Sequence, residues 1–271
     1  MRFDGASAIV TGAGQGIGRA LAVALAARGA RVLVNDRSEG LAAEVAAQID
    51  GVAHAGDVRD PTAIATMVSA ANAAFGQVDM LFSNAGFATG EPDGPTSRDD
   101  AHWQDNWDIH VMAHLRASRL VLPQMLARRS GVLVNVASAA GVLSQIGDAA
   151  YSATKHAAVS LAQSLAIEHA ADGIHVSVVC PLYVATPLLG YSGTDIESRP
   201  NGVITADEVA EKTLEGVSAG RFMIYPHPEA QAFFEKRASD TDRWVAGMQR
   251  LRNRVVKDSE GTDPAAIHKH I

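Results

Sequence analysis

Residues 6–29 read ASAIVTGAGQGIGRALAVALAARG, and this stretch decides the fold. Residues 6–10 form a short apolar run typical of a buried strand, and the repeat of Ile17, Leu21 and Leu25 then predicts a helix that stops at Gly29. A strand, a glycine turn and a helix in this order let the backbone approach a pyrophosphate, whose charge lies at the helix N-terminus. We therefore expect dinucleotide contacts from the turn residues Gly12, Gly14, Gln15, Gly16, Ile17 and Gly18.

A second predicted strand, residues 31–35, ends at Asp36. A carboxylate at this position accepts hydrogen bonds from the adenosine ribose hydroxyls and repels a 2′-phosphate, which favours NAD over NADP. Arg37 keeps NADP open as the less favoured alternative, because a guanidinium can stack on adenine or pair with a 2′-phosphate.

Strand and helix patterns alternate through the rest of the chain. Further strands are expected at 52–56, 79–83, 132–137, 174–180 and 221–225, with helices at 61–75, 99–128 (bent before Pro123), 151–171 and 205–218. Such alternation predicts right-handed βαβ units, and so an α/β fold with one doubly wound parallel sheet covered on both faces. Asp57 and Val58, after the third strand, are placed to meet the adenine, whereas Asp60 is the expected cap of the Pro61 helix.

Composition limits the classes of function. The 271 residues carry a net charge of −7 without a basic stripe, which excludes a nucleic-acid surface and makes the 243–257 run a solvated helix face. The one cysteine, Cys180, lies in an apolar run and indicates a reduced compartment. No apolar signal region or membrane-length apolar run is present, so the sequence predicts a cytoplasmic protein of one domain that does not bind a membrane.

Three residues carry the expected chemistry. Tyr151 and Lys155 are four positions apart and share a helix face, so the ammonium is expected to pull the pKa of the phenol toward 7. A phenol with such a pKa can donate and accept protons. Ser138 follows the strand at 132–137 and could hold a substrate oxygen there.

These motifs together resemble the short-chain dehydrogenase/reductase family. The resemblance rests on the glycine turn, Asp57, the run Asn84-Ala85-Gly86, Ser138 and Tyr151-x-x-x-Lys155, in this order and spacing. It implies a Rossmann-type sheet of seven strands, a nicotinamide cofactor, and a homotetramer or homodimer.

The resemblance also implies individual roles. Tyr151 would be the general acid/base, Lys155 would also bond the nicotinamide ribose, and Ser138 would orient the substrate oxygen. Asn84, Ala85 and Gly86 would lie along the adenosine side. Further cofactor contacts are implied for Pro181, Val184 and Thr186.

Two positions depart from the family pattern. His110 stands where the family has an asparagine that anchors a proton-relay water, so an imidazole that titrates near pH 6.5 either serves the relay or only packs. Leu182 follows Pro181 where the family has glycine, which narrows the substrate side. His110 and His114 lack a third ligand at metal spacing, so no metal is expected.

The catalytic domain is expected to span residues 1–256. Residues 188–203 lack periodicity and are interpreted as a lid over the cleft, with a simple surface loop as the alternative. Residues 228–256 form a helical extension that packs on its own subunit or covers a neighbour's site, and 257–271 are expected to be a disordered tail.

The predicted function is hydride transfer between NAD(H) and a hydrophobic or aromatic secondary alcohol or ketone, with a water chain past Lys155 returning the proton to solvent. Apolar side chains are expected near the reacting carbon at Leu143, Ile146, Leu182, Tyr183, Leu188 and Leu189. An NADPH-dependent carbonyl or 3-ketoacyl reductase is the enzymatic alternative. A catalytically silent NAD(H) sensor is the non-enzymatic one, against which the Ser138, Tyr151 and Lys155 set speaks.

Overall fold

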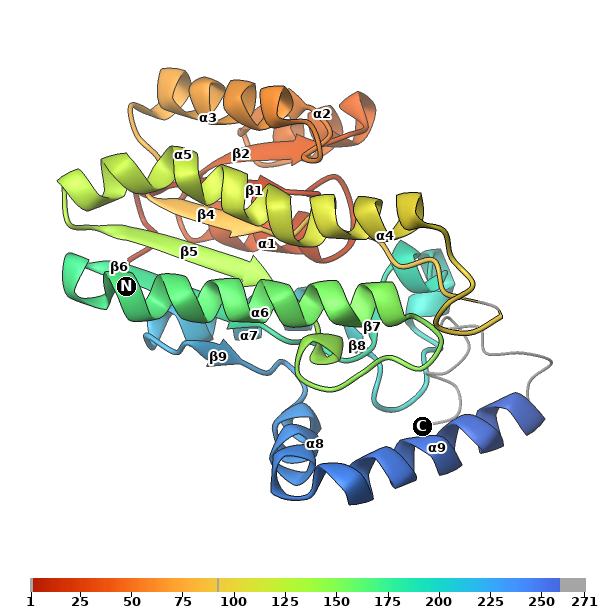
Figure 1. Cartoon of the computed structure of the whole chain (residues 1–271). Helices are drawn as coiled ribbons and strands as arrows, with labels where there is room; N and C mark the ends of the chain where they lie inside the picture. Colours follow the sequence, from red (N-terminus) through yellow and green to blue (C-terminus); the bar gives the residue numbers. More distant parts are fainter. Residues whose placement is uncertain (1, 92, 259–271) are drawn as a thin grey trace.

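The computed structural model describes residues 2–91 and 93–258 and shows one α/β domain (Figure 1). Its main sheet has seven strands in the order β3-β2-β1-β4-β5-β6-β9, and every pairing in it is parallel. These strands are β1 (Ser7–Thr11), β2 (Arg31–Asp36), β3 (Val52–Ala55), β4 (Met80–Ser83), β5 (Gly131–Val136), β6 (Ile174–Val179) and β9 (Met223–Ile224). Strands β1, β4 and β5 are buried along their whole length, as their apolar runs require when helices cover both faces.

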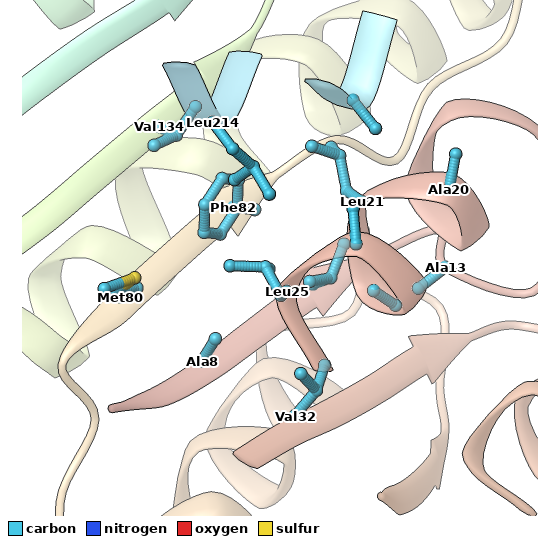
Figure 2. Close-up of a cluster of buried hydrophobic side chains, with 14 of the residues drawn as sticks. Ala8, Ala13, Ala20, Leu21, Leu25, Val32, Met80, Phe82, Val134 and Leu214 are labelled. Atoms are coloured by element: carbon cyan, nitrogen blue, oxygen red, sulfur yellow. The ribbon is translucent and has the colours of Figure 1, made fainter. Parts of the chain in front are cut away.

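Helices cover both faces of the sheet. One face carries α1 (Gly16–Ala27), α2 (Glu39–Gln48) and α7 (Ala206–Ser218), and the other carries α3 (Pro61–Phe75), α5 (Ala113–Ala127) and α6 (Ala149–His169). Figure 2 shows the first layer, where Leu21 and Leu25 of α1 lie beside Phe82 of β4 and Leu214 of α7. These four side chains are at most 1% exposed, so α1 is fixed firmly behind the glycine turn.

The order of the strands determines where in the sheet a dinucleotide-binding crevice is expected. The chain builds β1, β2 and β3 outward in one direction and then returns to add β4 on the other side of β1. The carboxyl ends of β1 and β4 therefore flank the switch point, where open α/β sheets bind dinucleotides.

The structure changes several predicted elements. The expected helix at 99–128 consists of α4 (Asp100–Trp107), a π-helical turn (Asp108–Met112) and α5, so the interruption lies at 108–112 and not before Pro123, which is inside α5. Helix α2, which was not predicted, has a weakly amphipathic sequence. It begins at Glu39 and is capped by Ser38, whose hydroxyl accepts from the Leu41 N–H. The last strand is shorter than expected. A second sheet pairs β7 (Val184–Ala185) with β8 (Ile204–Thr205), a contact between residues far apart in sequence.

The segment between β7 and β8 contains the expected lid. It holds two 3-10 turns, Pro187–Leu189 and Gly193–Ile196, and returns to the body where Thr205 and Glu208 form a capping box at the start of α7. The C-terminal extension consists of α8 (Pro228–Ser239) and α9 (Thr241–Asp258), with the predicted break between them. Of the predicted tail, residues 259–271 lie outside the described residues. No helix in the described ranges is long and apolar enough to span a bilayer.

Candidate active site

A cleft of about 400 Å³ opens at the carboxyl ends of the central strands. The predicted site residues line it, with the exceptions of Gly14, Gly18 and His110, which lie behind its surface. Segments from seven parts of the chain therefore meet in one cleft.

The glycine turn has the shape of a cradle. Gly12 and Gly16 have φ values of +61° and +56°, and a Cβ on Gly18 would lie 2.1 Å from the Gly12 carbonyl oxygen. The Asn84 amide donates to the carbonyls of Thr11 (2.9 Å) and Gly12 (3.2 Å) and so holds this turn against β4. Since the Gln15 side chain gives α1 no cap, the backbone N–H groups at its start suit the pyrophosphate of a dinucleotide.

Asp36 lies against this turn at the end of β2. Its carboxylate accepts from the Gly14 N–H (3.0 Å) and the Ser38 N–H (3.0 Å), and only 9% of the residue is exposed. Arg37 beside it is exposed and also lines the cleft. The acid is thus held in a fixed position, while the guanidinium extends toward solvent.

Asp57 has a partner that the sequence analysis missed. Arg59 donates to both Asp57 oxygens, at 3.1 Å and 2.7 Å to Oδ2 and 3.2 Å to Oδ1, and keeps the pKa of this carboxyl below its usual value. Arg59 also pairs with Asp105 of α4 (2.9 Å) and itself lines the cleft. The Asp57 carboxylate is therefore already bonded to an arginine at the end of the cleft that is expected to hold the adenosine.

Tyr151 and Ser138 meet at the other end of the cleft. Ser138 begins a 3-10 turn (Ala139–Gly141) directly after β5, and its hydroxyl bonds the Tyr151 phenol. Burial raises the pKa of Tyr151 to about 12, and the Ser138 bond only partly offsets this rise.

Lys155 does not have the predicted effect on Tyr151. Its Nζ is 5.4 Å from the centre of the Tyr151 ring and donates to the Val136 carbonyl (3.1 Å), and burial lowers the pKa of Lys155 to about 8. In the protein without a bound cofactor, the expectation of a Tyr151 pKa near 7 is wrong. Burial of the phenol raises this pKa by more than the attraction of the Lys155 ammonium lowers it.

His110 lies next to Tyr151, behind the surface of the cleft. The π-helical turn places its ring 5.3 Å from that of Tyr151, centre to centre, with Nδ1 3.0 Å from the Thr154 hydroxyl and Nε2 accepting from the Phe87 N–H (3.3 Å). Because Nε2 accepts, Nδ1 carries the proton. Burial is the main cause that lowers the pKa of His110 well below 6.5, and the charge of Lys155 adds to it. The predicted titration of His110 near pH 6.5 is therefore wrong.

The substrate side of the cleft is more polar than predicted. Leu182, Tyr183, Leu188 and Leu189 line it as expected, but Leu143 and Ile146 do not, since Leu143 packs in the core. Gln145 and Asp148, which the sequence analysis missed, line it too. Among the described residues, no group of three or more His, Cys, Asp or Glu side chains could hold a metal ion.

Comparison with known proteins agrees with this geometry. The family model described as short chain dehydrogenase matches residues 6–197. The chain is 33% identical to 1-deoxy-11-beta-hydroxypentalenate dehydrogenase of Streptomyces avermitilis, over 91% of this chain and 93% of that protein. It is 37% identical to cis-4-hydroxycyclohexanecarboxylate dehydrogenase of Sinomonas cyclohexanicum, over 75% of this chain and 86% of that protein.

Reductases and cofactor complexes are also among the similar proteins. The chain is 36% identical to 3-oxoacyl-[acyl-carrier-protein] reductase of Escherichia coli, over 69% of this chain and 77% of that protein. A short-chain dehydrogenase/reductase of Burkholderia phymatum in complex with NAD superposes with a TM-score of 0.80, at 29% identity, over 89% of this chain and 96% of that chain. The 3-ketoacyl-(acyl-carrier-protein) reductase of Brucella melitensis complexed with NADH has a TM-score of 0.74 at 29% identity, over 83% of this chain and 98% of that chain.

Proposed function

The chain belongs to the short-chain dehydrogenase/reductase family and is an oxidoreductase of that family, and we propose that it transfers hydride between NAD(H) and a hydrophobic or aromatic secondary alcohol or ketone. One observation carries this proposal. The glycine turn, which leads into the uncapped N-terminus of α1, lines the same cleft as Ser138, Tyr151 and Lys155. The leucines that line the substrate side favour an apolar body for the substrate.

The proposed mechanism assigns one task to each catalytic side chain. In the oxidation direction, Tyr151 accepts the proton of the substrate hydroxyl while Ser138 donates a hydrogen bond to the same oxygen. A bound nicotinamide supplies the hydride acceptor and, when oxidised, a positive charge. Lys155 holds its ammonium between Tyr151 and the end of β5, where it stabilises the phenolate.

We propose that His110 acts in its neutral form as a positioning residue beside Tyr151. Its Nδ1 bonds the Thr154 hydroxyl and its Nε2 accepts from the backbone, so it orders α6 without itself changing charge. Because both ring nitrogens are bonded inside the protein, this proposal takes the packing alternative for His110 and not the relay.

NAD is the proposed cofactor, with NADP as the alternative. The fixed Asp36 carboxylate supports NAD, because it accepts from ribose hydroxyls and repels a phosphate. The exposed Arg37 is the feature that favours NADP.

A homotetramer or homodimer in the cytoplasm is also proposed. Exposed apolar side chains on α5 and α6, Leu120 and Ile167, support association, and Cys180, the single cysteine, supports a reduced compartment. Light scattering after gel filtration and cell fractionation test these two statements.

The test of the function is a screen of ketones and secondary alcohols with NAD(H) and NADP(H), followed by nicotinamide absorbance. Turnover is expected with apolar substrates, and Tyr151→Phe is expected to lower kcat by about 10²–10⁴-fold with NADH affinity retained, because only the proton transfer is lost. Wild-type turnover in Tyr151→Phe would contradict the mechanism. A second candidate, 3-ketoacyl reduction, is favoured by the 36% identity to the Escherichia coli reductase, and turnover of a ketoacyl thioester with NADPH would support it.

A further inference from the structure

Two buried carboxylates meet at the start of the helix that carries Tyr151 and Lys155. Asp148 is the N-cap of α6, and Glu91 reaches the same turn from the loop after β4, 58 residues earlier in the sequence. Each residue is only 1% exposed, and neither pairs with an arginine or lysine among the ion pairs of the described residues. Buried acids of this kind need hydrogen-bond donors.

The donors are the first three N–H groups of α6. Glu91 accepts from Ala149 (2.8 Å) and Ala150 (3.1 Å). The Asp148 carboxylate accepts from Tyr151 (3.1 Å), and the Asp148 carbonyl accepts from Ser152 (3.2 Å). The Ser152 bond is the first regular bond inside the helix. The three N–H groups before it, which have no partner within the helix, are all satisfied by carboxylates, and these also favour the positive end of the helix.

The same two residues bind the loop to the helix. The second Asp148 oxygen accepts from the Gly90 N–H (3.2 Å), and the Glu91 N–H donates to the Gly147 carbonyl (2.7 Å). This loop begins with Gly86, Phe87 and Ala88, which line the cleft. The loop that forms this wall of the cleft is therefore joined to the first turn of α6 by hydrogen bonds from both residues.

Asp148 also acts on the charge of the phenol. The groups that face Tyr151 are Lys155 of α6, Asp148 at its cap, Cys180 after β6, His110 of the π-helical turn and Ser138 after β5. Asp148 and Lys155 have opposite effects on a phenolate, because the carboxylate repels it and the ammonium attracts it. Burial raises the pKa of Asp148 itself, with Glu91 and His102 as its charged or titratable neighbours.

We propose that Glu91 and Asp148 are positioning residues for the reaction, which hold the first turn of α6, and with it Tyr151, against the loop that lines the cleft. This inference rests on the proposed hydride transfer. Asp148 is the member of the pair that also acts directly on Tyr151, since its carboxylate bonds the Tyr151 N–H. Glu91 acts only through the backbone of the helix.

The test compares Asp148→Asn and Glu91→Gln with Asp240→Asn, an exposed carboxylate that accepts from the Arg243 N–H at the start of α9. In Asp148→Asn the amide oxygen can still accept from the Tyr151 N–H, but the NH₂ group faces the Gly90 N–H and that hydrogen bond is lost. In Glu91→Gln one of the hydrogen bonds from the Ala149 and Ala150 N–H groups is lost in the same way. Each variant at the pair is expected to lower kcat about tenfold, the effect of one lost charge-assisted hydrogen bond, while Asp240→Asn leaves it unchanged.

The pH dependence separates positioning from mere stability. In Asp148→Asn the acidic limb of kcat/KM for alcohol oxidation is expected to move about 0.5–1 unit lower, because the phenolate loses a repelling neighbour. Glu91→Gln is expected to lower kcat with a smaller movement of this limb. Ultraviolet titration of the phenol, identified by its loss in Tyr151→Phe, reads the same shift without turnover.

The outcomes are distinct. If both variants keep the wild-type kcat and phenol titration and lose only thermal stability, the pair caps the helix and does nothing more, and the proposal is overturned. Absence of turnover in the wild-type enzyme would instead contradict the proposed function. Asp148→Ser, which keeps a cap for the Tyr151 N–H without the charge, replaces Asp148→Asn in the same comparison if that variant does not fold.

Discussion

Asp36 is the residue on which the proposed preference for NAD over NADP rests. Its carboxylate is held by the Gly14 and Ser38 N–H groups and so presents a fixed negative charge at the adenosine end of the cleft. Asp36→Ala is expected to lower the ratio of kcat/KM for NAD to that for NADP by about 10–100-fold, because a charge-assisted bond to the ribose is lost and the repulsion of a 2′-phosphate ends. Steady-state kinetics with both cofactors measure the ratio.

The control for this prediction is Arg37→Ala. If Arg37 only stacks on adenine, the variant weakens both cofactors alike and leaves the ratio unchanged. An unchanged ratio in Asp36→Ala together with a large loss of NADP activity in Arg37→Ala would reverse the assignment.

His110 gives a prediction about pH dependence. Since burial keeps its pKa well below 6.5, His110 stays neutral through the working range and contributes no limb to the pH profile. His110→Asn is therefore expected to leave the position of every limb of kcat/KM unchanged, while kcat falls because the shorter amide cannot reach both Thr154 and the Phe87 N–H. Loss of a limb near pH 6.5 in this variant would show that the imidazole titrates during turnover.

The buried side chain of His114 lowers the stability of the folded protein. The ring is 1% exposed, both of its nitrogens are without a hydrogen-bond partner among the described residues, and burial lowers its pKa to about 3. The unfolded chain therefore binds a proton near pH 6.5 that the folded chain does not, and stability falls as the pH falls from about 6.5 toward 3.

This sign predicts the behaviour of His114→Leu. Leucine has a similar volume and no polar atoms, so the variant is expected to be at least as stable as the wild type at pH 7 and about 2 kcal/mol less sensitive to a change from pH 7 to pH 5. Urea unfolding at the two pH values measures the difference. Equal pH sensitivity of the two proteins would contradict the assignment.

Motif residues could be predicted from the sequence because each acts within a short stretch. Tyr151 and Lys155 share a face at helical spacing, and Gly12 and Gly18 belong to one turn. Glu91 could not be found in this way, because its partners lie 58 residues away, and the dominance of burial over Lys155 in setting the pKa of Tyr151 depends on the whole cleft.

At the scale of elements, the alternation of strands and helices correctly predicted one doubly wound parallel sheet covered on both faces. The π-helical turn at Asp108–Met112 was missed because the local sequence continues a helical pattern, and the turn inserts His110 between α6 and the loop at Phe87. The β7–β8 pair was missed because two-residue strands carry no period. Both features shape the cleft, one behind Tyr151 and the other at the base of the segment expected to be the lid.

The glycine turn gives a prediction at this scale. Gly18→Ala is expected to destabilise the fold and to lose NADH binding, because the new Cβ would lie 2.1 Å from the Gly12 carbonyl oxygen and 2.5 Å from the Asn84 amide. Gly40→Ala is the matched control in the first turn of α2, where a Cβ meets nothing within 4 Å and an alanine is expected to add about 0.5–1 kcal/mol of stability. Thermal unfolding and NADH fluorescence compare the two. Normal NADH affinity in Gly18→Ala would show that the turn is not the pyrophosphate cradle.

At the scale of the whole molecule, two large apolar side chains are exposed on the layer of α5 and α6, and three others, Phe233, Val245 and Val256, are exposed on α8 and α9. Leu120 of α5 and Ile167 of α6 are 42% and 80% exposed, and both helices lie on the same face of the sheet (Figure 1). A side chain as exposed as Ile167 favours burial against a second copy of the chain. In a symmetric dimer the same surface patch of each copy forms the interface.

Ile167→Glu tests this face. A carboxylate placed in an apolar contact between copies loses its hydration without a partner, so the variant is expected to elute as a smaller species than the wild type at equal concentration. Val245→Glu on α9, where the side chain is 42% exposed, is the control and is expected to leave the mass unchanged. Light scattering after gel filtration gives both masses. If Ile167→Glu keeps the wild-type mass and Val245→Glu lowers it, the association surface is the C-terminal extension, and the helix layer of α5 and α6 faces solvent.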